Sequence, residues 1–225
     1  MPVVVNYVAA VTDRRSPRPL SLFPRGTARE AAVFAAAVAL FVDAAFYVAL
    51  NESHLGGGAL IVWSSLKTVI IVAGIGWLAW ETRAWAFVMV ALNFALIALE
   101  DSVGITAPLG VWLIEEGGLR AGPQGANEQL VRRGVTMVAL LGPTLYLGSR
   151  APAWLRRAVW TLIGLLAAIF VAAVLGDAIA DRRGTNLDEV VEEPLFSLTV
   201  GFVAGLVVEW WQRRRITDPT TGLPR

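Results

Sequence analysis

One aspartate and one lysine interrupt the first two long apolar stretches of the chain, and their side chains are the first candidates for chemistry. Asp43 lies within residues 30–50, and Lys67 lies within residues 59–80. Lys67 is the only lysine in the chain, and all other Lys or Arg positions are arginine. A charged group deep in lipid is costly, so we expect each to face protein, water or an opposite charge.

The two charges are predicted at nearly the same depth. If residues 30–50 run outward and residues 59–80 return, Asp43 lies about 10 Å and Lys67 about 12 Å below the outer membrane boundary, at the helical rise per residue. The turn between them is short, so the two helices are expected to be antiparallel neighbours. This predicts an ion pair, with Ser64 and Tyr47 one helical turn away as further hydrogen-bond partners.

Other polar residues are expected at the same end of the membrane. Asn93 and Glu100 share one helical face, and Asp177 lies near the outer end of a later stretch. We hypothesise that these three residues join Asp43 and Lys67 in an outward-open pocket that forms a substrate or ion pathway. The alternative is a locked Asp43–Lys67 pair that only fixes helix register, with Glu100 and Asp177 reaching the interface.

The composition predicts what must hold these residues. Of 225 residues, 56% are hydrophobic and 16% are charged, and the mean hydropathy is +0.61. Soluble domains carry roughly 25% charged residues, and a helix needs about 20 apolar residues to cross a bilayer. The chain is therefore predicted to be all-α, a polytopic bundle of six membrane-spanning helices.

The predicted spans follow the apolar stretches. Residues 1–29 form a cytoplasmic or interfacial arm, and residues 212–225 form a cytoplasmic tail. The six spans are expected at residues 30–50, 59–80, 85–105, 133–149, 158–180 and 194–211.

The basic residues predict the orientation, because arginine in short loops favours the cytoplasmic side. With the N-terminus inside, 13 basic residues fall on the inner side and five on the outer side. Seven of the nine tryptophans fall near the predicted inner boundary, the headgroup level that indole rings favour. Both termini are therefore predicted to be cytoplasmic, in a multi-pass protein of the plasma membrane.

Several function classes are disfavoured. The chain has no cysteine, a single histidine (His54) and no G-x-S-x-G motif, so thiolate sites, histidine-rich metal sites and serine hydrolysis are not expected. A formal net charge of +1 gives no argument for nucleic acid. No cofactor is expected, and a metal site is left open: the acidic residues of 181–193 form carboxylate pairs that could hold calcium loosely. That segment is more readily a solvated helix, with Pro194 starting the last span.

Small residues at four-residue spacing predict close helix packing in lipid. The last span carries such a ridge, and so does the one before it. Both spans are expected to pack tightly, against each other or against a second copy. The ridge residues are Gly164, Ala168, Ala172 and Gly176 in one span, and Ser197, Gly201 and Gly205 in the other. Ala31, Ala35 and Ala39 of the first span are attributed to its general alanine content.

Two functions fit the pattern, and neither of them is catalytic. The first is a small carrier or channel for a cation, a proton or an amine. The second is a non-catalytic membrane subunit or lipid-binding scaffold of a larger complex. A membrane enzyme that acts on lipid through its carboxylates ranks below both. The expected partners are the lipid bilayer and either a second copy or another membrane subunit.

Overall fold

The computed structural model describes residues 26–52, 57–103, 112, 116, 141–183 and 187–217. All regular secondary structure in this part of the chain is α-helical. Residues 141–150 are also helical. The remaining helices are α1 (Thr27–Glu52), α2 (Gly57–Thr82), α3 (Trp85–Val103), α6 (Ala153–Arg183) and α7 (Leu187–Thr217).

Four of these helices are long and apolar enough to cross a membrane, which confirms the predicted all-helical membrane bundle. The candidate spanning segments are Thr27–Val48, Val62–Thr82, Leu155–Ala173 and Glu192–Arg214. α3 contributes a shorter apolar helix, Trp85–Leu99. The predicted span 133–149 is described only from residue 141 onward. The count of six, the orientation and the identity of the membrane therefore stay predictions.

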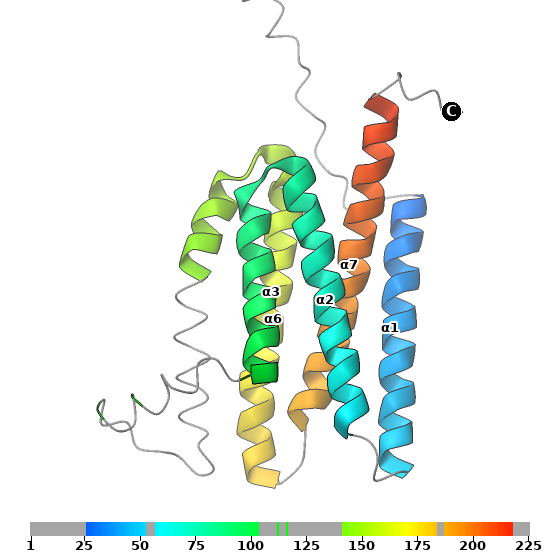
Figure 1. The fold of residues 1–225 in the computed structure, drawn as a ribbon, viewed down its shortest axis with the longest axis vertical. Helices are drawn as coiled ribbons and strands as arrows, with labels where there is room; N and C mark the ends of the chain where they lie inside the picture. The colour runs from blue at the N-terminus through cyan, green and yellow to red at the C-terminus, as the bar shows by residue number, and fades with distance from the viewer. Residues whose placement is uncertain are drawn as a thin grey trace, which may run out of the picture.

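The helices form two layers with α1 at one edge (Figure 1). α2 and α3 form a hairpin that lies in front of α6 and α7 in this view. The most extensive interface joins α1 to α7, followed by α6 with α7 and α2 with α3, whereas α1 and α2 barely meet. The start of α1 and the end of α7 lie at the same end of the bundle as the α2–α3 turn. α7 is therefore the central helix that both α1 and α2 contact.

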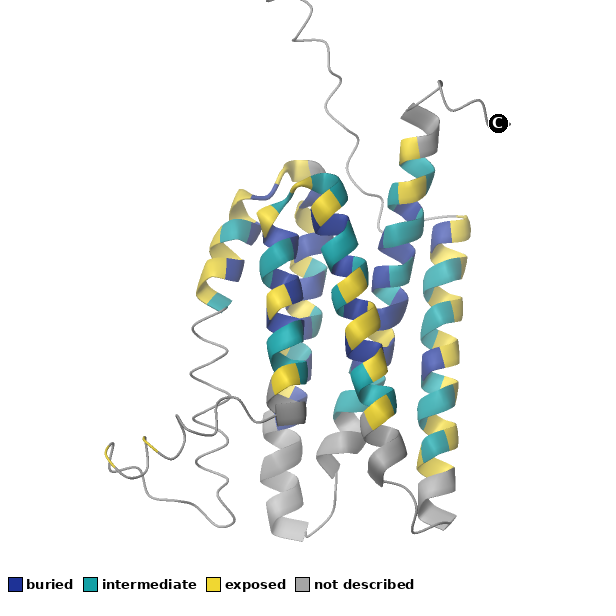
Figure 2. Cartoon of the chain, in the orientation of Figure 1, coloured by how far each residue is buried: buried dark blue, intermediate teal, exposed yellow. Residues whose placement is uncertain are grey.

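The core lies where α2, α3, α6 and α7 meet (Figure 2). The outward faces expose large apolar side chains. Ile71, Phe87, Phe94, Leu162 and Leu206 are completely buried in the core. Large apolar side chains such as Phe34, Phe41 and Trp80 are instead more than 70% exposed. In the most apolar stretch of α1, only 6% of the residues are buried. Large exposed apolar patches are rare on soluble monomers, whereas in a membrane the lipid chains cover them.

The small-residue ridge of α7 packs against α1, which differs from the pairing expected from sequence. A Cβ atom added to Gly201 would lie 2.5 Å from Ala36 Cβ and 2.6 Å from the Ala32 backbone oxygen. Ala28 and Ala39, on the same face of α1, are buried. The face of α1 that packs on α7 is therefore made of Ala28, Ala32, Ala36 and Ala39. Of the row Ala31, Ala35 and Ala39 noted in the sequence, this face includes only Ala39.

The ridge predicted on α6 is not a uniform contact face. α6 does pack against α7, as expected. Yet Gly164 is exposed, and a Cβ placed there would meet no atom within 4 Å. Ala168 is half-buried, Ala172 is buried, and the burial of Gly176 is not described. The buried face of α6 is made mainly of larger side chains, including Leu155, Val159, Leu162 and Leu166.

Candidate functional site

The ammonium group of Lys67 is completely buried and is held by two carboxylates. Lys67 Nζ lies 2.7 Å from Asp43 Oδ1 and forms a second ion pair with Glu193 Oε2. It also donates to the Glu193 backbone oxygen at 3.3 Å and faces Ser197 Oγ at 3.4 Å. The relative exposure of the side chains is 0% for Lys67, 11% for Asp43 and 13% for Glu193. We refer to Asp43, Lys67 and Glu193 as the charged triad.

Asp43 has partners for both of its carboxylate oxygens. Trp63 Nε1 donates to Oδ1 at 2.7 Å, and the Ser197 hydroxyl donates to Oδ2. The Trp63 ring also lies beside the lysine, with its centroid 5.7 Å from Nζ, a distance that allows a cation–π contact. Phe46 packs beside this indole, with the two ring centroids 6.3 Å apart. Three helices therefore contribute to one hydrogen-bonded cluster.

Helical periodicity explains how each of the three helices places its residues of the cluster on one face. Trp63 and Lys67 are four residues apart, so they lie on one face of α2. Glu193 and Ser197 have the same spacing on α7, directly before the turn that carries Gly201. On α1, Asp43 continues the face of Ala28, Ala32 and Ala39 that packs on α7. The close approach of α1 and α7 therefore brings the aspartate against the serine and the lysine.

The contact predicted between Asp43 and Lys67 is present, but its surroundings differ from the prediction. α1 and α2 are not close neighbours, because the turn of α7 that carries Glu193 and Ser197 completes the site. Tyr47 is 60% exposed, and the expectation that it supports Asp43 was wrong. Ser64 accepts a hydrogen bond from Thr68 Oγ1 through its backbone oxygen. The donors to Asp43 besides Lys67 are Trp63 and Ser197.

Glu193 is the member of the triad that sequence reasoning missed. The residues before Pro194 were expected to form a separate solvated helix, with the proline starting the last span. Instead α7 begins at Leu187 and continues through Pro194. A proline inside a helix has no N–H for the carbonyl four residues earlier, which weakens the helix at that point. Membrane helices tolerate such a proline, and here it follows the residue that binds Lys67.

Comparison with known proteins gives no further guide to this site. No family model, curated protein or solved structure matches the chain significantly.

Asn93 belongs to a different cluster from the one predicted. Its Nδ2 atom donates to Thr144 Oγ1 at 2.9 Å and to the Met89 backbone oxygen at 2.7 Å, which ties α3 to the helical residues 141–150. Both side chains are buried. The structure therefore does not bring Asn93 to Lys67.

The remaining predicted site residues cannot be added to the triad. The side chains of Glu100 and Asp177 lie outside the described residues, although α3 and α6 include both positions. His54 also lies outside them. Among the side chains that are described, no group of three or more histidine, cysteine, aspartate or glutamate residues is arranged to hold a metal ion. The role of the five predicted residues as an ion pathway remains untested.

Trp63→Phe should lower the free energy of unfolding by about 1.5–3 kcal/mol, the usual contribution of a hydrogen bond to a charged group. Phenylalanine keeps an aromatic ring beside Lys67 but removes the Nε1 donor to Asp43. Chemical unfolding in detergent micelles would measure the change. Trp80→Phe is the matched control, because Trp80 is 82% exposed and should tolerate the substitution. Equal stability of the two variants would contradict a structural role for the indole N–H.

Proposed function

We propose that the protein is a small carrier for a proton or a monovalent cation, inorganic or amine, and that the charged triad is its binding site. The observation that supports this most directly is that Asp43 and Glu193 both contact one ammonium group. With all three groups ionised, the triad carries a net charge of −1. One more proton or monovalent cation neutralises it, which favours binding in a low-dielectric setting.

The hydrogen-bond count supports the same proposal. Four oxygen atoms lie within hydrogen-bonding distance of Lys67 Nζ, from Asp43, Glu193 and Ser197. An ammonium has only three protons to donate. The oxygens can therefore accept a further proton or coordinate a small cation. The carboxylates retain some exposure while Lys67 has none, so an arriving cation meets the carboxylates first.

Lys67 acts in this proposal as a tethered competitor of the cation. An empty site with two buried carboxylates would be strongly unfavourable, because their charges would be uncompensated. The lysine neutralises one of them when no cation is bound and moves aside when one binds. Pro194 gives α7 a weakened backbone position next to Glu193, where the helix can bend as the lysine is displaced.

Glu193→Gln provides the test in proteoliposomes. We expect the wild-type protein to support flux of a proton, sodium, potassium or methylammonium, each assayed under its own gradient. The variant leaves a neutral Asp43–Lys67 pair without a spare negative charge, so its flux should fall to that of protein-free liposomes. Its fold should persist, because the lysine keeps one counter-ion.

Glu81→Gln is the matched control, since Glu81 also forms an ion pair, with Arg214 at 2.6 Å, but α2 places it near the opposite end of the bundle. This variant should transport like the wild type. Undiminished flux in Glu193→Gln would rule out the triad as the binding site, and absence of flux in the wild-type protein under every gradient would rule out the carrier.

A second candidate function has its own supporting observation. α1 contacts mainly α7, and its opposite face exposes Val33, Phe34 and Phe41 by 60–74%. Such a face suits either lipid or a helix of another subunit. The protein would then be a non-catalytic membrane subunit of a larger complex. A stoichiometric partner that co-purifies from the native membrane, together with absence of flux, would favour this function.

A further inference from the structure

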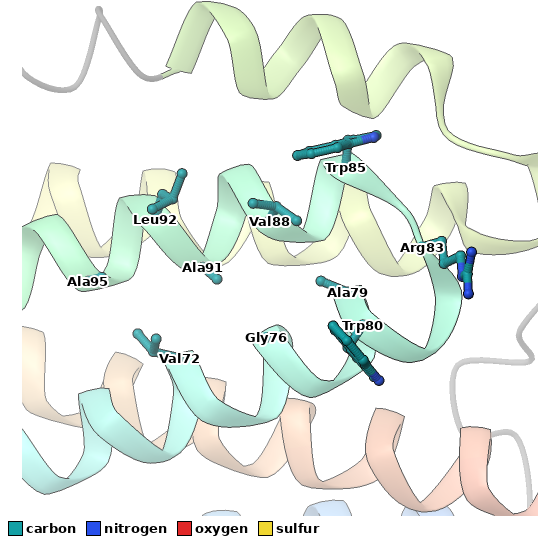
Figure 3. Close-up of a pocket in the computed structure, with 10 residues that line it drawn as sticks. All are labelled: Val72, Gly76, Ala79, Trp80, Arg83, Trp85, Val88, Ala91, Leu92 and Ala95. Carbon is teal, nitrogen blue, oxygen red and sulfur yellow. The ribbon is translucent and has the colours of Figure 1, made fainter.

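An apolar groove of about 780 Å³ runs between α2 and α3, and none of its lining residues belongs to the charged triad. Its floor is made of small residues, including Gly76, Ala79, Ala91 and Ala95. Figure 3 shows the groove opening between the two helices, with Arg83 in the turn that closes one end. Its volume falls in the range of ligand-binding pockets, roughly 300–1,000 Å³.

The length of the groove matches one leaflet of a bilayer. Along α3 it extends from Trp85 to Ala95, which corresponds to about 15 Å at the helical rise. The hydrocarbon core of a bilayer is about 30 Å thick. If the membrane boundary lies where the apolar segment Val62–Thr82 ends, the groove reaches from that boundary about to the midplane.

The mouth of the groove carries the residues expected at the headgroup level. Trp80 and Trp85 are 82% and 70% exposed, and their side chains diverge on either side of the groove (Figure 3). Indole rings favour this level of a membrane. The exposed Arg83 guanidinium lies between them in the chain and has no ion pair within the described parts of the protein. A guanidinium group matches the geometry of a phosphate and binds it through paired hydrogen bonds.

The backbone at Arg83 indicates that its side chain is retained at some cost to stability. Arg83 has φ +52°, and it is the only residue other than glycine with a positive φ in the described part of the chain. The position directly after a helix that adopts this conformation is usually glycine, because a Cβ atom is disfavoured there. A tight helical hairpin alone would favour glycine at this position, whereas the arginine places an exposed guanidinium group in the turn.

We propose that this groove binds one acyl chain of an anionic glycerophospholipid, with the phosphate held by Arg83. The charge of the arginine complements the headgroup, the tryptophans flank it, and the small residues of the floor accommodate the chain. This site is independent of the carrier proposal, because it shares no residue with the triad.

Native mass spectrometry of the purified protein, titrated with phosphatidylglycerol or phosphatidylcholine, tests the inference. We expect the wild-type protein to bind one phosphatidylglycerol in preference to phosphatidylcholine. Arg83→Gly should weaken that binding roughly tenfold or more, the effect of losing hydrogen bonds to a charged group. The melting temperature of lipid-free protein should stay equal or rise, because glycine suits the backbone.

A second variant tests whether the acyl chain binds in the groove. A Cβ on Gly76 would meet no atom within 4 Å, so Gly76→Leu can fill the groove without disturbing the helices. It should also reduce phosphatidylglycerol binding. Gly164→Leu and Arg150→Gln are the matched controls, since Gly164 is an exposed helical glycine and Arg150 an exposed arginine elsewhere. Both should bind lipid like the wild type.

Three results would overturn the proposal. Unchanged binding in Arg83→Gly and Gly76→Leu would place the lipid elsewhere. An equal loss in all four variants would indicate unspecific surface lipid. A lipid-free dimer that Gly76→Leu dissociates would identify a second copy of the chain as the occupant.

Discussion

Lys67→Met is expected to lower the free energy of unfolding by roughly 3–5 kcal/mol, the usual cost of removing one partner from a buried ion pair. Methionine is similar in length to lysine and carries no charge, so packing changes little. The variant leaves Asp43 and Glu193 facing the space of the lost ammonium, with 11% and 13% of their side chains exposed. Chemical unfolding in detergent micelles, followed by the loss of helical circular dichroism, measures the effect.

Removing the two negative charges as well should restore most of this stability. In the triple variant Lys67→Met, Asp43→Asn and Glu193→Gln, no buried charge is left uncompensated. The new amide oxygen at position 43 can still accept from Trp63 Nε1, and the amide NH2 group can donate to Ser197 Oγ, which now faces Asp43 Oδ2. Replacing buried ionic groups by neutral residues of similar volume removes the cost of taking their charges out of water. A triple variant no more stable than Lys67→Met alone would mean that charge compensation is not the cause.

The triple variant also separates the two roles that a buried triad can have. If the triad only fixed helix register, a stable neutral version would keep every function of the protein. The carrier proposal instead expects a folded protein without flux, because no group remains to bind a cation. Persistent flux in the triple variant would exclude the triad from the pathway.

The Asp43–Lys67 contact could be predicted because it depends on depth. The rise of a helix is fixed, so the distance of each residue from a span end follows from counting. Depth does not give the order of helices around the bundle. The short turn between α1 and α2 suggested direct neighbours, but the small-residue faces of α1 and α7 let these helices approach more closely.

Glu193 was missed because Pro194 fits two structures: the start of a helix, or a position inside a longer membrane helix. Proline is favoured at the first position of a helix, and Pro194 follows an acidic segment, so a span start was the natural interpretation. The alternative is a membrane helix that continues through the proline, as α7 does. The lysine provided the only signal: a buried ammonium with a single carboxylate has donors to spare, and a second acidic residue at the same depth could have been sought.

The second large effect is expected at the contact that brings Asp43 to α7. Gly201→Ala should lower the free energy of unfolding by about 1–3 kcal/mol, the range for overpacking a close contact. The added Cβ would lie 2.6 Å from the Ala32 backbone oxygen, which cannot rotate away. α1 must therefore shift as a unit, and Asp43 on the same face moves with it relative to Ser197. Thermal unfolding of the variant measures the loss.

Gly164→Ala is the matched control, because this glycine is also helical but has no atom within 4 Å of an added Cβ. Alanine should stabilise the protein there by up to about 1 kcal/mol, since glycine is unfavourable inside helices. A compensating change, Ala36→Gly, should recover part of the stability lost in Gly201→Ala by removing the Cβ that lies 2.5 Å away. Because the Ala32 oxygen remains in place, the recovery should be incomplete. Equal free energies of unfolding for Gly201→Ala and Gly164→Ala would contradict the close backbone contact between α1 and α7. This contact would then not be what places Asp43 against Ser197.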